Sequence, residues 1–292
     1  MGKKAVLVAL AVVCFPLVAF AFEITTINVP GSGGTAPQGI NDQGDIVGFF
    51  FNSSTGASNG FLLSRGSFTT VDFPGFLQTS PRGLNDRGEI VGQEDNGPIS
   101  GPTSTDGFIL KKGKFTQVDF PGVSFTGLFG INNAKEIVGN YIDSSGTNHG
   151  FKLEDGSFTS IDVPNSLGTF STGVNDLGDI VGFYIDSSGV IHGYLLEGYL
   201  LEDDEDDRFT TIDVPGAIDT RARDINDLGD IVGQYTSADG VTHAFLLRYR
   251  TFATIDAPGA VATFGRGINV LGDIVGNYND SSGVVHGFLA TR

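Results

Sequence analysis

The chain repeats one unit six times, and this repeat limits the possible folds more than any other feature. The marker is the asparagine in segments such as "GVNDLGDIVG", which starts at Gly173. It occurs at Asn41, Asn85, Asn132, Asn175, Asn226 and Asn269. Successive markers lie 44, 47, 43, 51 and 43 residues apart. A period in the low forties without a helical pattern is typical of β-propeller blades.

Each repeat contains four short strand-like runs, which in the fourth copy are residues 170–175, 179–185, 191–196 and 209–214. Links as short as "DLG" and "DSSGV" join the first three runs, and such links force antiparallel neighbours. The longest regular link, residues 215–221, is long enough to lead from the outer edge of one blade to the inner edge of the next. We therefore predict an all-β fold, a six-bladed β-propeller of four-stranded antiparallel blades with the "GIN" run innermost.

The two ends of the repeat region predict how the ring closes. Residues 24–30 form an outermost run without a blade of its own, and the chain stops at 286–292, the third run of the last blade. We predict that the N-terminal strand joins the last blade. This closure leaves no long apolar sheet edge exposed.

The first 21 residues predict a signal peptide, because a basic start precedes apolar residues 5–18 and a cleavage site of small residues. Residues 22–292 are then a single propeller domain. The only cysteine, Cys14, lies in the signal peptide, so the mature chain has no disulfide. We predict a secreted protein, extracellular or periplasmic, that is monomeric and has no membrane span in its mature chain.

The charge balance restricts the partners. The chain has 34 acidic and 17 basic side chains, a net charge of −17, which argues against nucleic acid as a partner. An acidic run follows a duplicated "GYLLE" segment and consists of Asp203, Asp204, Glu205, Asp206 and Asp207. It is either a solvated loop or a loose cation site, and we favour the loop. No cofactor motif is recognised, so no cofactor is predicted.

The units resemble the extracellular HAF repeat, named for its His-Ala-Phe tripeptide. His243-Ala244-Phe245 matches the tripeptide, and the copies that start at His149, His192 and His286 nearly do. The "GIND.GDIVG" stretch matches as well, and the resemblance covers about 24–292. It implies an exported repeat protein and implies no catalytic activity.

All four histidines occupy one position of the repeat: His149, His192, His243 and His286, with Asn59 and Asp106 in the first two copies. A metal site is one interpretation. However, equivalent positions on neighbouring third strands are about 15 Å apart, whereas zinc needs nitrogens at about 2.1 Å. We expect hydrogen bonds to the backbone near a turn instead, and no metal site.

The Asn-Asp-x-Gly-Asp segments resemble part of an acidic calcium loop, as at Asp227, Gly229 and Asp230. Calcium requires six to eight oxygen ligands, more than this short run provides. A hairpin turn, which uses asparagine and glycine for their backbone conformations, is the interpretation we favour.

One variable position points to function. Two residues before the isoleucine of "IN", the copies read Gln38, Arg82, Phe129, Thr172, Arg223 and Arg266. We predict that this position begins the innermost strand and faces the mouth of the central channel. The candidate ligand-binding residues are Arg82, Arg221, Arg223 and Arg266, whose forked donors suit a carboxylate or phosphate. The alternative is solvated arginines that offset local acidity.

Three function classes follow from this sequence. No nucleophile–base pair, metal cluster or carboxylate pair stands out, so no catalytic residue is predicted. The leading hypothesis is a non-enzymatic binding module for an acidic small molecule, a glycan or another extracellular polymer at the channel mouth. The second is a hydrolase or lyase acting on a sugar or lactone, which converging blade-specific polar residues would favour. The third is a structural matrix or surface protein.

Overall fold

The computed structural model describes residues 21–95, 105–198 and 209–292. All regular secondary structure in these residues is β-strand. The predicted signal peptide, except its last residue, and the acidic run Asp203–Asp207 lie outside the described residues.

The strands form six four-stranded antiparallel sheets, each a continuous stretch of the chain except the last. The first three blades are β2 (Gly34–Ile40), β3 (Ile46–Phe51), β4 (Ser58–Ser64) and β5 (Ser67–Val71); β6 (Gln78–Leu84), β7 (Ile90–Asp95), β8 (Thr105–Lys111) and β9 (Lys114–Val118); and β10 (Thr126–Ile131), β11 (Ile137–Ile142), β12 (Asn148–Glu154) and β13 (Ser157–Ile161). The other three are β14 (Gly168–Val174), β15 (Ile180–Ile185), β16 (Ile191–Leu196) and β17 (Phe209–Ile212); β18 (Asp219–Ile225), β19 (Ile231–Thr236), β20 (Thr242–Arg248) and β21 (Thr251–Ile255); and β22 (Ala262–Ile268), β23 (Ile274–Asn279), β24 (Val285–Thr291) and β1 (Glu23–Ile27).

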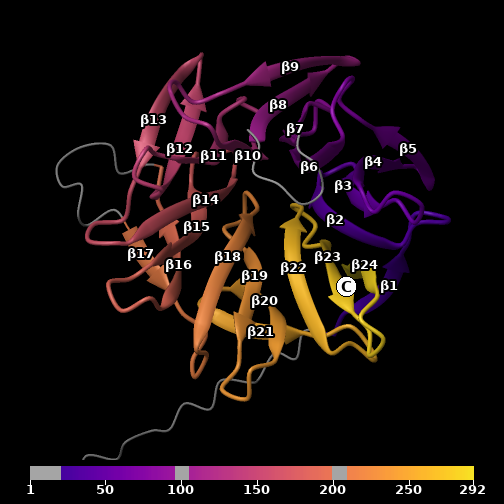
Figure 1. The fold of residues 1–292 in the computed structure, drawn as a ribbon. Helices are drawn as coiled ribbons and strands as arrows, with labels where there is room; N and C mark the ends of the chain where they lie inside the picture. The colour runs from indigo at the N-terminus through magenta and orange to yellow at the C-terminus, as the bar shows by residue number, and fades with distance from the viewer. Residues whose placement is uncertain (1–20, 96–104, 199–208) are drawn as a thin grey trace, which may run out of the picture.

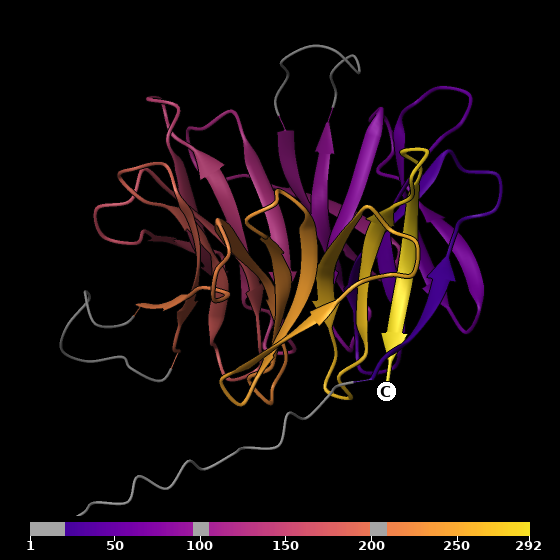
Figure 2. The ribbon, with the colours of Figure 1, turned by 90° about the horizontal axis from the view of Figure 1, so that it is seen from below.

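The blades stand around a central axis, with the first strand of each blade innermost (Figure 1). Each innermost strand contacts those of the two neighbouring blades, so six strands line the channel. The last blade takes its outer strand from the start of the chain, because β1 pairs antiparallel with β24 and sets Ile24 opposite Ala290. Figure 2 shows this strand beside the C-terminus. The predicted six-bladed propeller and its closure by the N-terminal strand are confirmed.

The hydrophobic core is divided among the six blade boundaries. At each boundary, the valine of "IVG" in one blade packs in one buried cluster with the aromatic ring of the third strand of the next blade, as Val47 does with Phe108. These rings are almost fully buried, and they are Phe61, Phe108, Phe151, Tyr194, Phe245 and Phe288. Burial of one such side chain contributes about 1.5–3 kcal/mol. The sequence-based prediction that they fill the space between blades is confirmed.

The glycine of "IVG" is required for this packing. A Cβ atom at Gly92 would lie 2.7 Å from Cζ of Phe108 and closer still to the carbonyl oxygen of Ser80. Real side chains do not approach so closely, so only glycine lets the ring and the first strand reach this strand.

The asparagines of the "IND" turns join neighbouring blades. Asn85 accepts the backbone N–H groups of Arg87 and Glu89 at 3.0 Å, which fixes its own turn. Its Nδ2 donates at 3.1 Å to the carbonyl oxygen of Asn132 in the next blade. The equivalent bond recurs at all six boundaries, with donors Asn41, Asn85, Asn132, Asn175, Asn226 and Asn269. The predicted turns are therefore confirmed, and they are also the joints of a closed ring.

The histidines have a structural role in their own blades. Nδ1 of His243 lies 2.9 Å from a carboxylate oxygen of Asp256, and the imidazole stacks on Tyr235 with the ring centres 5.2 Å apart. In the first blade, Asn59 donates in the same way to Asp72 at 3.0 Å. The prediction that the histidines form hydrogen bonds is confirmed. The predicted partner, a backbone group, is wrong, because the Asp-x-Pro corner after the fourth strand places a carboxylate beside the imidazole ring.

Candidate functional site

Every innermost strand contains one β-bulge, and the bulged residue is the variable position of the repeat. In β18, Ala222 pairs with Gly233 and Asp224 with Val232, which leaves Arg223 without a partner on β19. The six bulged residues are Gln38, Arg82, Phe129, Thr172, Arg223 and Arg266. A bulge changes the direction of a side chain. All six residues line one hollow of about 70 Å³ in the central channel.

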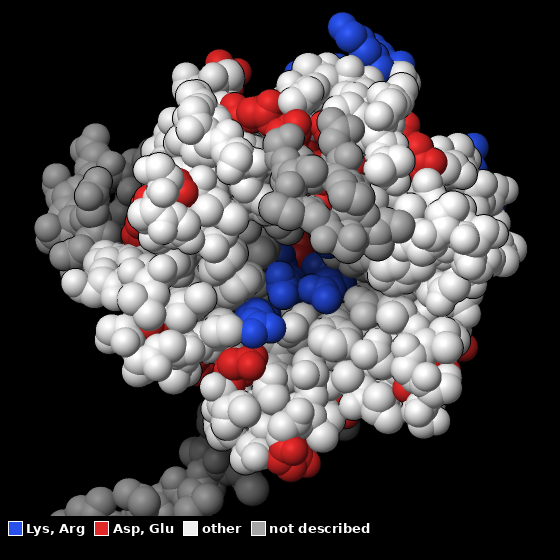
Figure 3. Space-filling model, in the orientation of Figure 1, with Lys and Arg blue, Asp and Glu red and all other residues white. Residues whose placement is uncertain are grey.

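The sequence placed this position at the beginning of the innermost strand, which is wrong by about four residues. Arg223 is the fifth of the seven residues of β18, because the link residues before it also pair with β19, as far as Asp219 opposite Thr236. The arginines therefore lie inside the channel. They converge as predicted, and Lys and Arg side chains form a patch at the centre of the face in Figure 3. Arg221 lies two residues earlier on β18.

Arg82 is held from both sides by the neighbouring blades. One of its terminal nitrogens donates to the side-chain oxygen of Gln38 at 3.0 Å. Its guanidinium carbon lies 5.2 Å from the ring centre of Phe49 and 5.6 Å from that of Phe129. Contacts between a cation and two aromatic faces fix the guanidinium before any ligand arrives.

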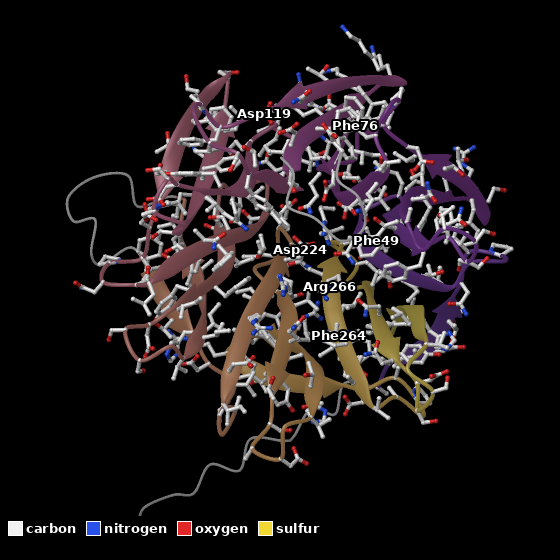
Figure 4. The ribbon with its side chains drawn as sticks, in the orientation of Figure 1. Phe49, Phe76, Asp119, Asp224, Phe264 and Arg266 are labelled. Atoms are coloured by element: carbon white, nitrogen blue, oxygen red, sulfur yellow. The ribbon has the colours of Figure 1, made fainter. Side chains whose placement is uncertain are left out.

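The other three arginines also rest on aromatic rings. The guanidinium carbons of Arg223 and Arg221 lie 5.0 Å and 5.8 Å from the ring centre of Phe183. That of Arg266 lies 5.5 Å from the ring of Phe264 (Figure 4). Nε of Arg266 also donates at 3.4 Å to the side-chain oxygen of Asn277. The four guanidinium groups are thus positioned by the scaffold.

Positive charge accumulates in the hollow, which we call the arginine cup. Burial lowers the pKa of Arg82 and of Arg266 to about 10. Burial, followed by the charges of Arg266, Arg221 and Arg82, lowers the pKa of Arg223 well below its ordinary value. In the part of the chain that the structure describes, the Nε groups of Arg82, Arg221 and Arg223 are buried without a hydrogen-bond partner. Solvated arginines would show none of these features.

One carboxylate belongs to the same hollow. Five blades have glycine after the bulged residue, whereas the fifth blade has Asp224. Its Oδ1 accepts the backbone N–H of Ile225 at 2.9 Å, and its Oδ2 accepts that of Ile268 in the next blade at 3.0 Å. Burial raises the pKa of Asp224 to about 7. The sequence analysis did not select this residue, although the break in a row of glycines was a usable signal.

The opposite end of the channel has the other sign of charge. A second hollow of about 80 Å³ is lined by the "IND" turns and includes Asp42, Asp86, Asp176 and Asp227. Burial, opposed by a hydrogen bond from the backbone of Val270, raises the pKa of Asp42, and the charges of the other three add to this effect. An anion is therefore attracted at the arginine end and repelled at the other.

The described residues show no group of three or more histidine, cysteine or acidic side chains that could hold a metal ion. They also contain no helix with the length and apolar character needed to cross a membrane.

Comparison with known proteins supports the fold class. No family model matches the chain, and no curated protein sequence matches it. Several solved structures have a similar fold. TolB from Acinetobacter baumannii is 10% identical with a TM-score of 0.58, over 85% of this chain and 64% of TolB. AofleA from Arthrobotrys oligospora is 12% identical with a TM-score of 0.53, over 90% of this chain and 81% of AofleA. The six-bladed fungal lectin from Aleuria aurantia is 13% identical with a TM-score of 0.47, over 76% and 77%.

The blades, their order and their closure define a six-bladed β-propeller. Within that class, this chain has an arginine cup on its axis.

Proposed function

We propose that this propeller is an exported, non-enzymatic binding module that takes an acidic small molecule or an acidic glycan at the arginine cup. One observation carries the proposal. Arginines from the second, fifth and sixth blades converge at the bulges of a single hollow, in a chain whose net charge is −17. Five of the six copies keep glycine directly after the bulge, whereas the bulged residue itself differs among the copies.

The chemistry of the cup suits an oxyanion. A guanidinium group presents its N–H donors in a plane that matches a carboxylate or phosphate. The aromatic contacts of Arg82, Arg223 and Arg266 hold these planes in place, so little side-chain entropy is lost on binding. Export is inferred from the N-terminal segment, and the HAF-type resemblance supports it.

The test is a calorimetric screen of sugar acids and sugar phosphates at low ionic strength. We expect at least one ligand to bind the parent, and Arg223→Ala and Arg266→Ala to weaken it at least about tenfold. Arg87→Ala, at the exposed turn between β6 and β7, is the matched control and should bind as the parent does. If every anion fails to bind, or if the two cup variants bind as well as the control, the proposal is wrong.

A hydrolase or lyase acting on an acidic sugar or lactone is the second candidate, and Asp224 is the observation that favours it. A carboxyl group with a pKa of about 7 beside a ligand site is suited to general acid–base catalysis near neutral pH. Product formation by the parent, lost in Asp224→Asn while ligand binding remains, would establish this candidate. Binding without any product supports the binding module.

A further inference from the structure

The balance of charge in the arginine cup indicates how many negative charges the ligand brings. Three guanidinium groups, of Arg82, Arg223 and Arg266, line the cup, and the charge of a fourth, Arg221, also acts on Arg223. Among the described residues, two carboxylates oppose these charges. Asp224 lines the hollow, and Asp219 lies 4.0 Å from Arg221. The free cup therefore carries an excess of about two positive charges.

The excess is not dispersed into solvent. Arg82, Arg223 and Arg266 are half-buried, and Arg221 exposes 29% of its side chain. Asp219 is the one carboxylate among the main influences on the pKa of Arg223, and three arginines act against it. Charges of one sign in a partly desolvated site repel one another strongly. A ligand with one negative charge would leave about half of the excess unbalanced.

The hollow and its donors suit a compact anion. A volume of about 70 Å³ has room for a phosphate or sulfate group. Donors reach the hollow from the second, fifth and sixth blades, that is, from several directions around the axis. Such an arrangement suits a tetrahedral group better than a flat carboxylate, which two coplanar donors satisfy.

We propose that the arginine cup selects a doubly charged tetrahedral oxyanion, a phosphate monoester end or free inorganic phosphate, over singly charged acids. This inference rests on the proposed function and narrows its ligand class.

The experiment compares ligands that differ in charge but little in size. Glucose 6-phosphate and glucuronate share the six-carbon skeleton of glucose and carry two charges and one charge at pH 8. Sulfate and acetate form a second pair. We expect each doubly charged ligand to bind at least about tenfold more tightly than its singly charged partner, because one more charge interacts with the excess. Inorganic phosphate is tested as a further ligand, to distinguish the free ion from a phosphate monoester. If it binds as tightly as glucose 6-phosphate, the ligand is the free ion, and if it binds more weakly, the ligand is a monoester. Either result supports the dianion.

The variants change the charge of the cup in both directions. Arg266→Gln should reduce the preference for the dianion, whereas Asp224→Asn should strengthen sulfate binding severalfold at pH 8, an increase that a loss of folding cannot mimic. Thermal melting confirms that each variant folds. If glucuronate binds as tightly as glucose 6-phosphate, the dianion inference is wrong while the proposed function stands. If no anion binds at all, both are wrong.

Discussion

The side-chain amide of Asn269 donates a 3.3 Å hydrogen bond to the carbonyl oxygen of Asn41, which precedes it by 228 residues. This bond is the sixth of a ring, because each of the other five marker asparagines makes the same bond to the blade that follows it. The ring is buried, so water cannot replace a bond that is lost. The contribution of this ring to the free energy of unfolding can be measured by substituting one of its asparagines.

Asn226→Ala should lower the free energy of unfolding by about 2–4 kcal/mol. Asn226 bonds the backbone N–H groups of Leu228 and Asp230 and the carbonyl oxygen of Asn269, and all three lose their partner. Urea denaturation measures the change. Leu228→Ala, at the exposed tip of the same turn, is the control and should cost less than about 0.5 kcal/mol. Equal effects of the two substitutions would contradict the ring as a source of stability.

Removal of residues 22–30 should lower the melting temperature by at least about 10 °C. The deletion removes β1, uncovers the backbone of β24 and leaves a cavity where Ile27 was buried. Thr25→Ala, which changes an exposed side chain of β1 and keeps its backbone, is the control. An unchanged melting temperature in the deletion would show that β1 does not close the ring.

Glu94 predicts a dependence of stability on pH. It occupies the position of Tyr141 in the third blade, and neither of its buried oxygens has a hydrogen-bond partner among the described residues. Burial, followed by the charges of Asp106, Asp119 and Asp95, raises its pKa from 4.5 to about 8. The folded state therefore favours the protonated carboxyl, and stability falls as pH rises from 4.5 through 8.

Glu94→Gln removes this titration. We expect the variant to exceed the parent in unfolding free energy by more than about 1 kcal/mol at pH 8.5, with the difference shrinking toward pH 5.5. Urea titrations at four pH values measure it. Glu23→Gln, at an exposed position of β1, should change little at any pH. A constant difference between Glu94→Gln and the parent across the range would refute the prediction.

The titration of His149 should also lower the stability of the fold as pH rises, for a different physical reason. Partial burial lowers the pKa of His149, but its hydrogen bonds to Asp162 and Asp143 and their charges outweigh burial, so the pKa is raised. The charged form stabilises the fold at pH values below the ordinary histidine pKa of about 6.5, and this contribution is lost as pH rises through the raised value. His149→Asn, which keeps a donor as Asn59 does, should therefore cost more stability at pH 5.5 than at pH 8.5.

Two denaturant titrations of His149→Asn and the parent measure this difference, and the other titrating groups cancel in it. A larger cost at the higher pH would contradict the assignment. Zinc is a separate test of the same residues. We expect no stoichiometric zinc binding, and tight binding that is lost in His192→Asn or His243→Asn would overturn the structural role of these side chains.

The sequence alone predicted the blades, their strand order and the closure, because these depend on short turns and on a period that a single chain displays. It predicted that the arginines converge near the channel axis, but it did not predict how far along the innermost strands they lie. A bulge adds one residue without disturbing the pattern of apolar residues, so the position of Arg223 in β18 is visible only in the pairing with β19. The bonds between asparagines of neighbouring blades were equally hidden, since each joins residues from turns that look self-sufficient in sequence.

The pairing of β1 with β24 has a consequence for the order in which the molecule is made. β1 precedes every other strand of the propeller in the sequence, yet its only sheet partner is β24, which follows all the others. Five blades can each form from neighbouring segments as the chain is synthesised, but β1 has no sheet partner until β24 is available. The final joint then has to close a loop of nearly the whole chain, an entropically costly step that local contacts cannot assist. The joint between β1 and β24 is therefore the last that the propeller can form.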